Sequence, residues 1–301
     1  MSQFLQISFD LGALPIEAAE QACMDCGASA ITLADARDEP VLEPAPGEIR
    51  LWPATRLQAL FAPGTPQDTT VHGLGVALGL DPDQLEVRWI ADRAWEREWL
   101  REFHARRFGR RLWICPHHEH VTDPGAAVLR LDPGLAFGTG THPSTALCLE
   151  WLDAHPPVDC DVIDYGCGSG VLALAAARLG AHTVHCFDID PQALIATRDN
   201  AAANRLSGHI RPCESAEALA APVALLMANI LLTPLVALAP RFGALVRPGG
   251  QILLAGLLES QAEEARQAYS SWFTLSPVGA REDWIALSGT RNGSAAQAAT
   301  G

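Results

Sequence analysis

A glycine-rich turn between a short strand and a helix is the segment of this sequence with the most evident chemistry. Residues 162–170 read V-I-D-Y-G-C-G-S-G, and an Ala- and Leu-rich stretch follows at 171–179. Glycines at alternate positions let the backbone turn sharply and approach a ligand where a Cβ would collide, and the start of a helix offers N–H groups to negative groups. A second apolar strand ends at Asp188, whose carboxylate can accept hydrogen bonds from ribose hydroxyls. The pattern indicates a site for a nucleoside-type cofactor.

The turn differs from a dinucleotide-binding fingerprint at one position. That fingerprint has a third glycine, which lets the helix and strand pack closely beside a pyrophosphate, and Val171 stands at its place. A nicotinamide-dependent dehydrogenase is therefore the weaker interpretation. We expect Asp164, the acidic residue before the turn, to accept a backbone hydrogen bond and to shape the turn.

Several motifs carry a resemblance to known enzymes. The pattern D-x-G-C-G-S-G resembles the first motif of S-adenosylmethionine-dependent methyltransferases, and M-A-N-I-L at 227–231 resembles the end of their fourth strand. The more specific segments are L-D-P-G-L-A-F-G-T-G-T-H-P-S-T at 131–145, W-E-R-E-W at 95–99 and R-L-W-I-C-P at 111–116. Together they resemble the bacterial ribosomal protein L11 methyltransferases, the PrmA family.

This resemblance, which covers roughly residues 1–290, implies an activity and a set of site residues. The implied reaction transfers methyl groups from S-adenosyl-L-methionine to lysine ε-amines and the N-terminal α-amine of ribosomal protein L11, up to trimethylation. Matched by position, the cofactor-binding residues of the family are Thr145, Gly166, Asp188 and Asn229. The glycine motif adds Gly168 and Gly170, and the specific loop adds Thr141 and His142.

Two of these residues, Asn229 and His142, are candidates for catalysis. A methyl acceptor must be a neutral amine, and deprotonating a lysine of pKa about 10.4 at pH 7 costs roughly 4–5 kcal/mol. Removing water from the amine and offering it oxygen acceptors offsets that cost. We expect Asn229 to position the amine or the methionine end of the cofactor. His142 either orients the amine or serves as a structural residue that bonds the backbone of its loop.

Alternating strands and helices must position these residues. From residue 127 onward, apolar strands alternate with helices, which is typical of a parallel, doubly wound sheet. A closing hairpin, 273–278 with 284–288, resembles that of methyltransferases. Upstream, the order β-α-β-β-α-β in about 90 residues predicts a ferredoxin-like domain. The expected fold class is α/β, a Rossmann-like methyltransferase domain with an N-terminal ferredoxin-like α+β domain.

The patterns also predict the segment boundaries. We expect a ferredoxin-like substrate-recognition domain at 1–91, a helical linker at 92–110, the methyltransferase domain at 111–290 and a disordered tail at 291–301. The linker assignment rests on an aromatic residue at every fourth position: Trp95, Trp99 and Phe103. Spacing of this kind is typical of one face of a helix.

Composition restricts the partners. The net charge of −14, from 21 basic and 35 acidic side chains, disfavours nucleic-acid binding and suits a basic protein substrate. The longest apolar run, 223–239, contains Asn229 and Pro234, so we expect no membrane span. Eight cysteines lack a secreted framework. We therefore expect a cytoplasmic protein, and we expect no metal. The resemblance implies that its partner is ribosomal protein L11, either free or in pre-ribosomal particles.

The absence of lysine is a further feature of the composition, since all 21 basic residues are arginine. Coding bias explains this most simply; the alternative is that a lysine-modifying enzyme avoids its own substrate side chain. Two other functions also stay open. One is a protein-lysine methyltransferase of the same fold that acts on another protein, and the other is a non-catalytic module that binds S-adenosylmethionine.

Overall fold

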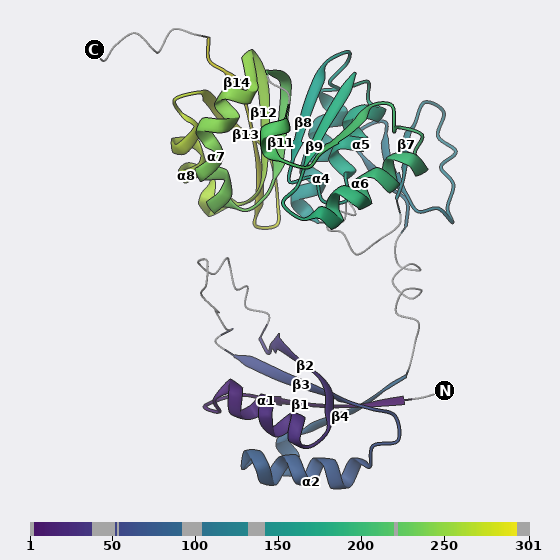
Figure 1. The fold of residues 1–301 in the computed structure, drawn as a ribbon, viewed down its shortest axis with the longest axis vertical. Helices are drawn as coiled ribbons and strands as arrows, with labels where there is room; N and C mark the ends of the chain where they lie inside the picture. Colours follow the sequence, from purple (N-terminus) through teal and green to yellow (C-terminus); the bar gives the residue numbers. More distant parts are fainter. Residues whose placement is uncertain are drawn as a thin grey trace, which may run out of the picture. The chain divides into compact units, whose positions relative to one another are not determined.

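The chain divides into two compact units, Met1–Glu98 and Trp99–Gly301 (Figure 1). The computed structural model describes residues 3–37, 52, 54–91, 104–131, 142–219 and 222–293. Each unit has a hydrophobic core of its own. Within the described residues, no helix is long and apolar enough to cross a membrane.

The first unit is a four-stranded antiparallel sheet with two helices on one face. Its elements are β1 (Gln3–Asp10), α1 (Ile16–Asp25), β2 (Ala28–Asp35), β3 (Thr55–Phe61), α2 (Gln67–Leu78), a 3-10 turn (Pro82–Gln84) and β4 (Glu86–Ala91). The sheet order is β2-β3-β1-β4, which confirms the predicted ferredoxin-like arrangement. Leu5, Ile7 and Phe9 alternate along β1 and are fully buried, because alternate side chains of a strand face the same side.

The second unit is built on a seven-stranded sheet in the order β10-β9-β8-β11-β12-β14-β13 (Figure 1). Its first five strands are parallel, and β14 runs antiparallel to both neighbours. The strands of this sheet are β8 (Asp161–Tyr165), β9 (Thr183–Phe187), β10 (Ile210–Cys213), β11 (Val223–Asn229), β12 (Val246–Leu258), β13 (Phe273–Arg281) and β14 (Trp284–Arg291). This confirms the doubly wound sheet and its closing hairpin.

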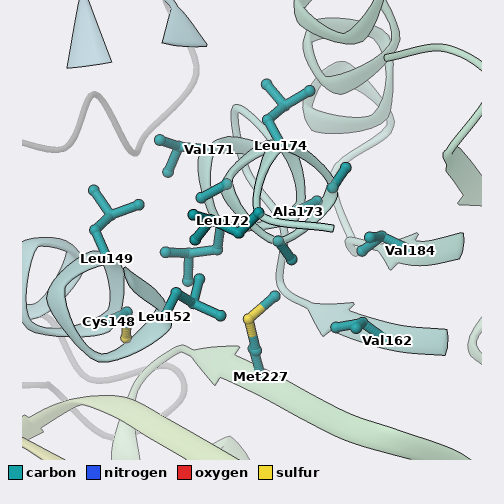
Figure 2. Packing of buried hydrophobic residues seen from close by; sticks show 14 of the residues in the cluster. Cys148, Leu149, Leu152, Val162, Val171, Leu172, Ala173, Leu174, Val184 and Met227 are labelled. Carbon is teal, nitrogen blue, oxygen red and sulfur yellow. The ribbon is translucent and has the colours of Figure 1, made fainter. Parts of the chain in front are cut away.

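Helices cover both faces of this sheet. They are α4 (Pro143–Ala154), α5 (Val171–Arg178), α6 (Pro191–Ala203), α7 (Leu232–Leu245) and α8 (Ala262–Tyr269), with 3-10 turns at Ala216–Ala218 and Glu259–Gln261. Strand residues alternate between two cores: Val162 packs with α4 and α5, whereas Ile163 packs with α7 and α8. Figure 2 shows the first core, where Met227 lies between the sheet and both helices.

A smaller sheet precedes α4 and is fixed to it by one carboxylate. The sheet contains β5 (Arg106–Phe108), β6 (Leu112–Cys115) and β7 (Ala127–Arg130). Asp153, near the end of α4, is 6% exposed and accepts hydrogen bonds from the backbone N–H groups of Arg110 and Leu112. A Cβ at Gly109 would lie 2.5 Å from Asp153 Oδ2, so only glycine fits there.

The predicted helical linker is wrong where the structure describes it. Residues 106–108 form β5, in which Arg106 pairs with Ile114 and the side chain of Phe108 is buried. Pairing with β6 therefore makes this end of the linker a strand, although the spacing of the aromatic residues before it is typical of a helix. Those residues, 92–103, lie outside the described part of the chain.

Two further differences concern the ends of elements. The sequence patterns predict no strand between Asp188 and Val223, but Ile210–Cys213 form β10, an edge strand of the large sheet, where Pro212 is tolerated. The predicted tail begins too early, since Arg291 pairs with Phe273 and Asn292 N donates to Trp272 O at 2.8 Å. Residues 294–301 of the predicted tail lie outside the described part of the chain.

Candidate active site

A cavity of about 450 Å³ lies where several strands of the large sheet end. It is reached by the carboxyl ends of β8, β9 and β11, which carry Gly166, Asp188 and Asn229 respectively. This is where parallel α/β sheets bind ligands, and the volume lies in the usual range of cofactor sites. The cavity is lined by His142, Ser144, Tyr165, Gly166, Gly168, Phe187, Asp188, Ile189, Asn229, Ile230, Leu231, Pro234, Leu238, Gly256 and Trp284.

The glycine turn enters the cavity with a left-handed backbone. Gly166, Gly168 and Gly170 have φ of 79°, 53° and 80°, conformations that favour glycine. Gly166 N donates to Phe187 O at 2.7 Å, which ties the turn to the end of β9. A Cβ at Gly166 would lie 2.3 Å from Ile230 Cγ2. Gly166 and Gly168 line the cavity, whereas Gly170 lies behind it as the N-cap of α5.

Asp188 connects the turn with the loop after β9. Its Oδ2 accepts from Gly168 N at 2.9 Å, and its Oδ1 accepts from Asp190 N at 3.0 Å. Both carboxylate oxygens are thereby oriented by backbone groups. Each oxygen can accept more than one hydrogen bond, so the carboxylate can still receive hydroxyl donors from a ligand in the cavity.

Asn229 is held in place by a residue from another element. Its Nδ2 donates to Thr145 Oγ1 at 3.1 Å, and Thr145 on α4 is 1% exposed. Thr145 does not line the cavity, so the structure places it behind Asn229. Within the described residues, Asn229 Oδ1 makes no hydrogen bond and can accept one from a ligand.

His142 caps α4 and also forms part of the cavity wall. Its Nδ1 accepts from Ser144 N at 3.3 Å, and its ring packs edge-on against Trp284 with centroids 4.6 Å apart. Burial lowers the pKa of His142, so the imidazole is neutral at pH 7 and does not repel a cation in the cavity. Thr141, the other candidate in this loop, lies outside the described residues.

The structure adds cavity residues that sequence analysis missed. Tyr165 lines the cavity, as do Ile189, Trp284 and Gly256. Gly256 has φ of 80°, and a Cβ there would lie 2.5 Å from Ile230 O. Ile230 is therefore confined between two glycines, Gly166 and Gly256. The positive φ of Gly256 arises at a register shift between β12 and β14, which periodicity does not reveal.

Asp164 lies beneath the turn, as predicted. It is 1% exposed, and its Oδ2 accepts from Ala173 N at 2.9 Å, in the first turn of α5. Its Oδ1 is buried without a hydrogen-bond partner among the described residues. Burial, together with the nearby charge of Asp188, raises the pKa of Asp164 to about 7, against the opposing effect of the Ala173 hydrogen bond.

This pKa predicts a pH-dependent stability. Between about pH 4 and pH 7 the folded protein retains a proton that the unfolded chain releases, so stability falls as the pH rises through that window. Asp164→Asn does not titrate and keeps an acceptor for Ala173 N. The melting temperature of the variant minus that of the parent protein should therefore be roughly 5 °C larger at pH 8 than at pH 5.5. Thermal melts at both pH values check this, with the exposed Asp199→Asn as control; a pH-independent difference would contradict it.

Similarity to known proteins extends over nearly the whole chain. A family model described as "Ribosomal protein L11 methyltransferase (PrmA)" matches residues 3–292. The ribosomal protein L11 methyltransferase of Pseudomonas aeruginosa (strain LESB58) is 47% identical over 289 residues, which cover 96% of this chain and 98% of that protein. The protein of the same name from Azotobacter vinelandii is 45% identical, with coverage of 96% and 99%.

A solved structure agrees with these relatives. The ribosomal protein L11 methylase from Lactobacillus delbrueckii subsp. bulgaricus is 30% identical, with a TM-score of 0.59, and the match covers 64% of this chain and 100% of that chain. The family model and the relatives that match nearly the whole chain name the same family. This chain belongs to the ribosomal protein L11 methyltransferase family, PrmA.

Proposed function

We propose that this protein transfers methyl groups from S-adenosyl-L-methionine to amino groups of ribosomal protein L11. The acceptors are lysine ε-amines and the N-terminal α-amine, and the substrate is the cytoplasmic ribosomal protein, free or in pre-ribosomal particles. The observation that carries the proposal is the cavity in which the glycine turn, the Asp188 carboxylate and the Asn229 amide meet. The names of the relatives at 45–47% identity supply the substrate.

The residues of the cavity suit this cofactor. Asp188 offers carboxylate oxygens for ribose hydroxyls, and the backbone at Gly166 and Gly168 can approach a ligand closely because no Cβ intervenes. The carboxylate of Asp188 lines the cavity and favours a cation there. When bound, S-adenosylmethionine supplies a methyl group on a sulfonium, which is a good leaving group. Acid–base chemistry at the leaving group is therefore unnecessary, and alignment is the main task of the protein.

The acceptor amine needs an oxygen acceptor and a dry surrounding. Asn229 Oδ1, fixed from behind by Thr145, provides the acceptor in our proposal. Leu231 and Trp284 provide apolar wall, and burial of the amine beside them lowers its pKa toward the neutral form. His142 bonds Ser144 through Nδ1, so we assign it to the wall and to the cap of α4. Each methylation replaces one N–H donor of the amine by a methyl group. Trimethylation therefore requires a neighbouring acceptor that tolerates the loss of these donors, and a neutral amide does so.

Asn229→Ala should lower kcat for L11 methylation about 30-fold, because one hydrogen bond to the reacting amine is lost. Thr145→Val keeps the Asn229 side chain but removes its support, and a smaller loss is expected. Radiolabelled methyl transfer measures both, with circular dichroism as a test of folding. Unchanged transfer by Asn229→Ala would show that another group holds the amine.

The proposed function itself is tested by mass spectrometry. Ribosomal protein L11 from a strain without the methyltransferase is incubated with the enzyme and S-adenosylmethionine, and mass increases of about 14 Da per methyl group are located on peptides. Modified lysines and a modified N-terminus are expected. Transfer to other proteins of an extract but not to L11 would favour a different protein substrate, and binding of the cofactor without transfer would favour a non-catalytic module.

A further inference from the structure

Helix α6 and its C-cap carry a row of polar side chains on the side that packs against the rest of unit 2. Thr197, Asn200 and Asn204 follow one another at i, i+3 and i+7, a spacing that places them on one face of a helix. Thr197 is fully buried and Asn204 is 4% exposed. Buried polar groups cost free energy unless they are hydrogen-bonded, so their partners show what this face of the helix does.

Two of the three bond the glycine turn. Thr197 Oγ1 donates to Gly168 O at 3.1 Å, and Asn200 Nδ2 donates to Ser169 O at 2.9 Å. A Cβ at Gly170 would lie 2.8 Å from Thr197 Oγ1. The close approach of this threonine therefore also explains why position 170 is a glycine. Neither Thr197 nor Asn200 lines the cavity, and both therefore act on the turn from its outer side.

The opposite side of the same turn is held by Asp188. Gly168 N donates to Asp188 Oδ2, while Asp190, which donates its backbone N–H to Asp188 Oδ1, is the N-cap of α6. The turn, the carboxylate and the helix thus form a closed ring of hydrogen bonds. Within it, the amide N–H of Gly168 is fixed by Asp188 and its carbonyl by Thr197.

We propose that Thr197 and Asn200 are positioning residues for the cofactor, acting through the glycine turn and Asp188. They hold two carbonyls of the turn toward α6, so that these dipoles do not face the cavity and the Asp188 carboxylate keeps its orientation. The inference rests on the proposed function, because the ligand concerned is S-adenosylmethionine or its product. Loss of these hydrogen bonds should weaken cofactor binding more than it slows the transfer step.

Asn204, the C-cap residue of α6, provides a matched control at the end of the same helix. Its Oδ1 accepts from Arg130 N at 2.6 Å, and its Nδ2 donates to Arg130 O at 2.7 Å, so it holds β7. Its Nδ2 also donates to the backbone oxygen of Asn200 at 2.9 Å, but none of its hydrogen bonds among the described residues reaches the glycine turn. Asn204→Ala should lower the melting temperature and leave the affinity for the cofactor product within about twofold of the parent value.

The test measures S-adenosylhomocysteine binding by calorimetry. Thr197→Val keeps the shape of the side chain without its hydroxyl and should raise the Kd about tenfold, with kcat at saturating cofactor within about twofold. Thr197→Ser restores the hydroxyl and should recover most of the affinity. Asn200→Ala, at a half-buried position, gives a second variant with the same expected direction if Thr197→Val folds poorly.

The outcomes separate this inference from the proposed function. Parent-like Kd values for Thr197→Val and Asn200→Ala would overturn the inference, as would Thr197→Ser binding as weakly as Thr197→Val. A loss of affinity in Asn204→Ala equal to that in the other variants would show a general effect of helix stability and would also overturn it. Failure of the parent protein to bind S-adenosylhomocysteine would instead contradict the proposed function.

Discussion

Asp188→Ala should weaken S-adenosylhomocysteine binding by roughly 100-fold. Hydrogen bonds to a charged group contribute about 1.5–3 kcal/mol each, and the substitution removes the acceptors proposed for the ribose hydroxyls. It also releases Gly168 N and Asp190 N, which the carboxylate holds at 2.9 and 3.0 Å. Calorimetric titration of the purified variant measures the effect.

Two further variants separate the loss of a negative charge from the loss of the Asp188 oxygens. Asp199→Ala removes one negative charge from an exposed position on α6 and should leave the Kd within about twofold, since an exposed charge is screened. Asp188→Asn keeps the size of the side chain and one oxygen, so an intermediate affinity is expected. A parent-like Kd for Asp188→Ala would exclude this carboxylate as the ribose acceptor.

Gly256→Ala should lower kcat for methyl transfer about 100-fold in a protein that still folds. The new Cβ would lie 2.5 Å from Ile230 O and 2.8 Å from Ile230 C, and backbone atoms cannot move aside as a flexible side chain can. The displaced segment includes Asn229, and a misplacement of about 1 Å at a reacting centre costs on the order of 100-fold in rate. Steady-state kinetics on L11 measures the effect.

Gly249→Ala is the matched control for the backbone conformation. Gly249 also lies in β12 with φ of 73°, but a Cβ at this position would meet no atom of the described residues within 4 Å. The substitution should cost about 1 kcal/mol of stability through left-handed strain and leave kcat close to the parent value. Equal losses of kcat in both variants would attribute the effect to backbone strain rather than to contact with Ile230.

The sequence is most informative where a local pattern and a strand end coincide. The glycine turn, Asp188 and Asn229 each follow an apolar strand directly, so their positions along the chain indicate one edge of a parallel sheet, and the structure brings all three to one cavity. The fold class follows from the alternation of strands and helices for the same reason. The role of Asp164 is also predictable, because it lies at the strand end just before the glycine turn, and the turn brings the first helical turn of α5, with Ala173 N, back to it.

The remainder depends on pairing between distant segments. Thr197 bonds a turn 29 residues earlier in the chain, and no local rule distinguishes it from an exposed helical threonine. Gly256 is required by a bulge that only the pairing of β12 with β14 creates. Likewise, β5 becomes a strand because β6 lies beside it. Thr145 differs again: its motif marks it as a site residue, yet its place behind Asn229 follows only from the packing of α4.

The attachment of Asp153 to the β5–β6 turn has a mechanical consequence. Asp153 fixes this turn to one end of α4. The other end of the same helix carries His142 and Thr145, which lie about 16 Å and about 12 Å from Asp153 along the helix axis at 1.5 Å per residue. The helix that supports Asn229 through Thr145 is therefore also the helix that anchors the smaller sheet, so both attachments share one rigid element.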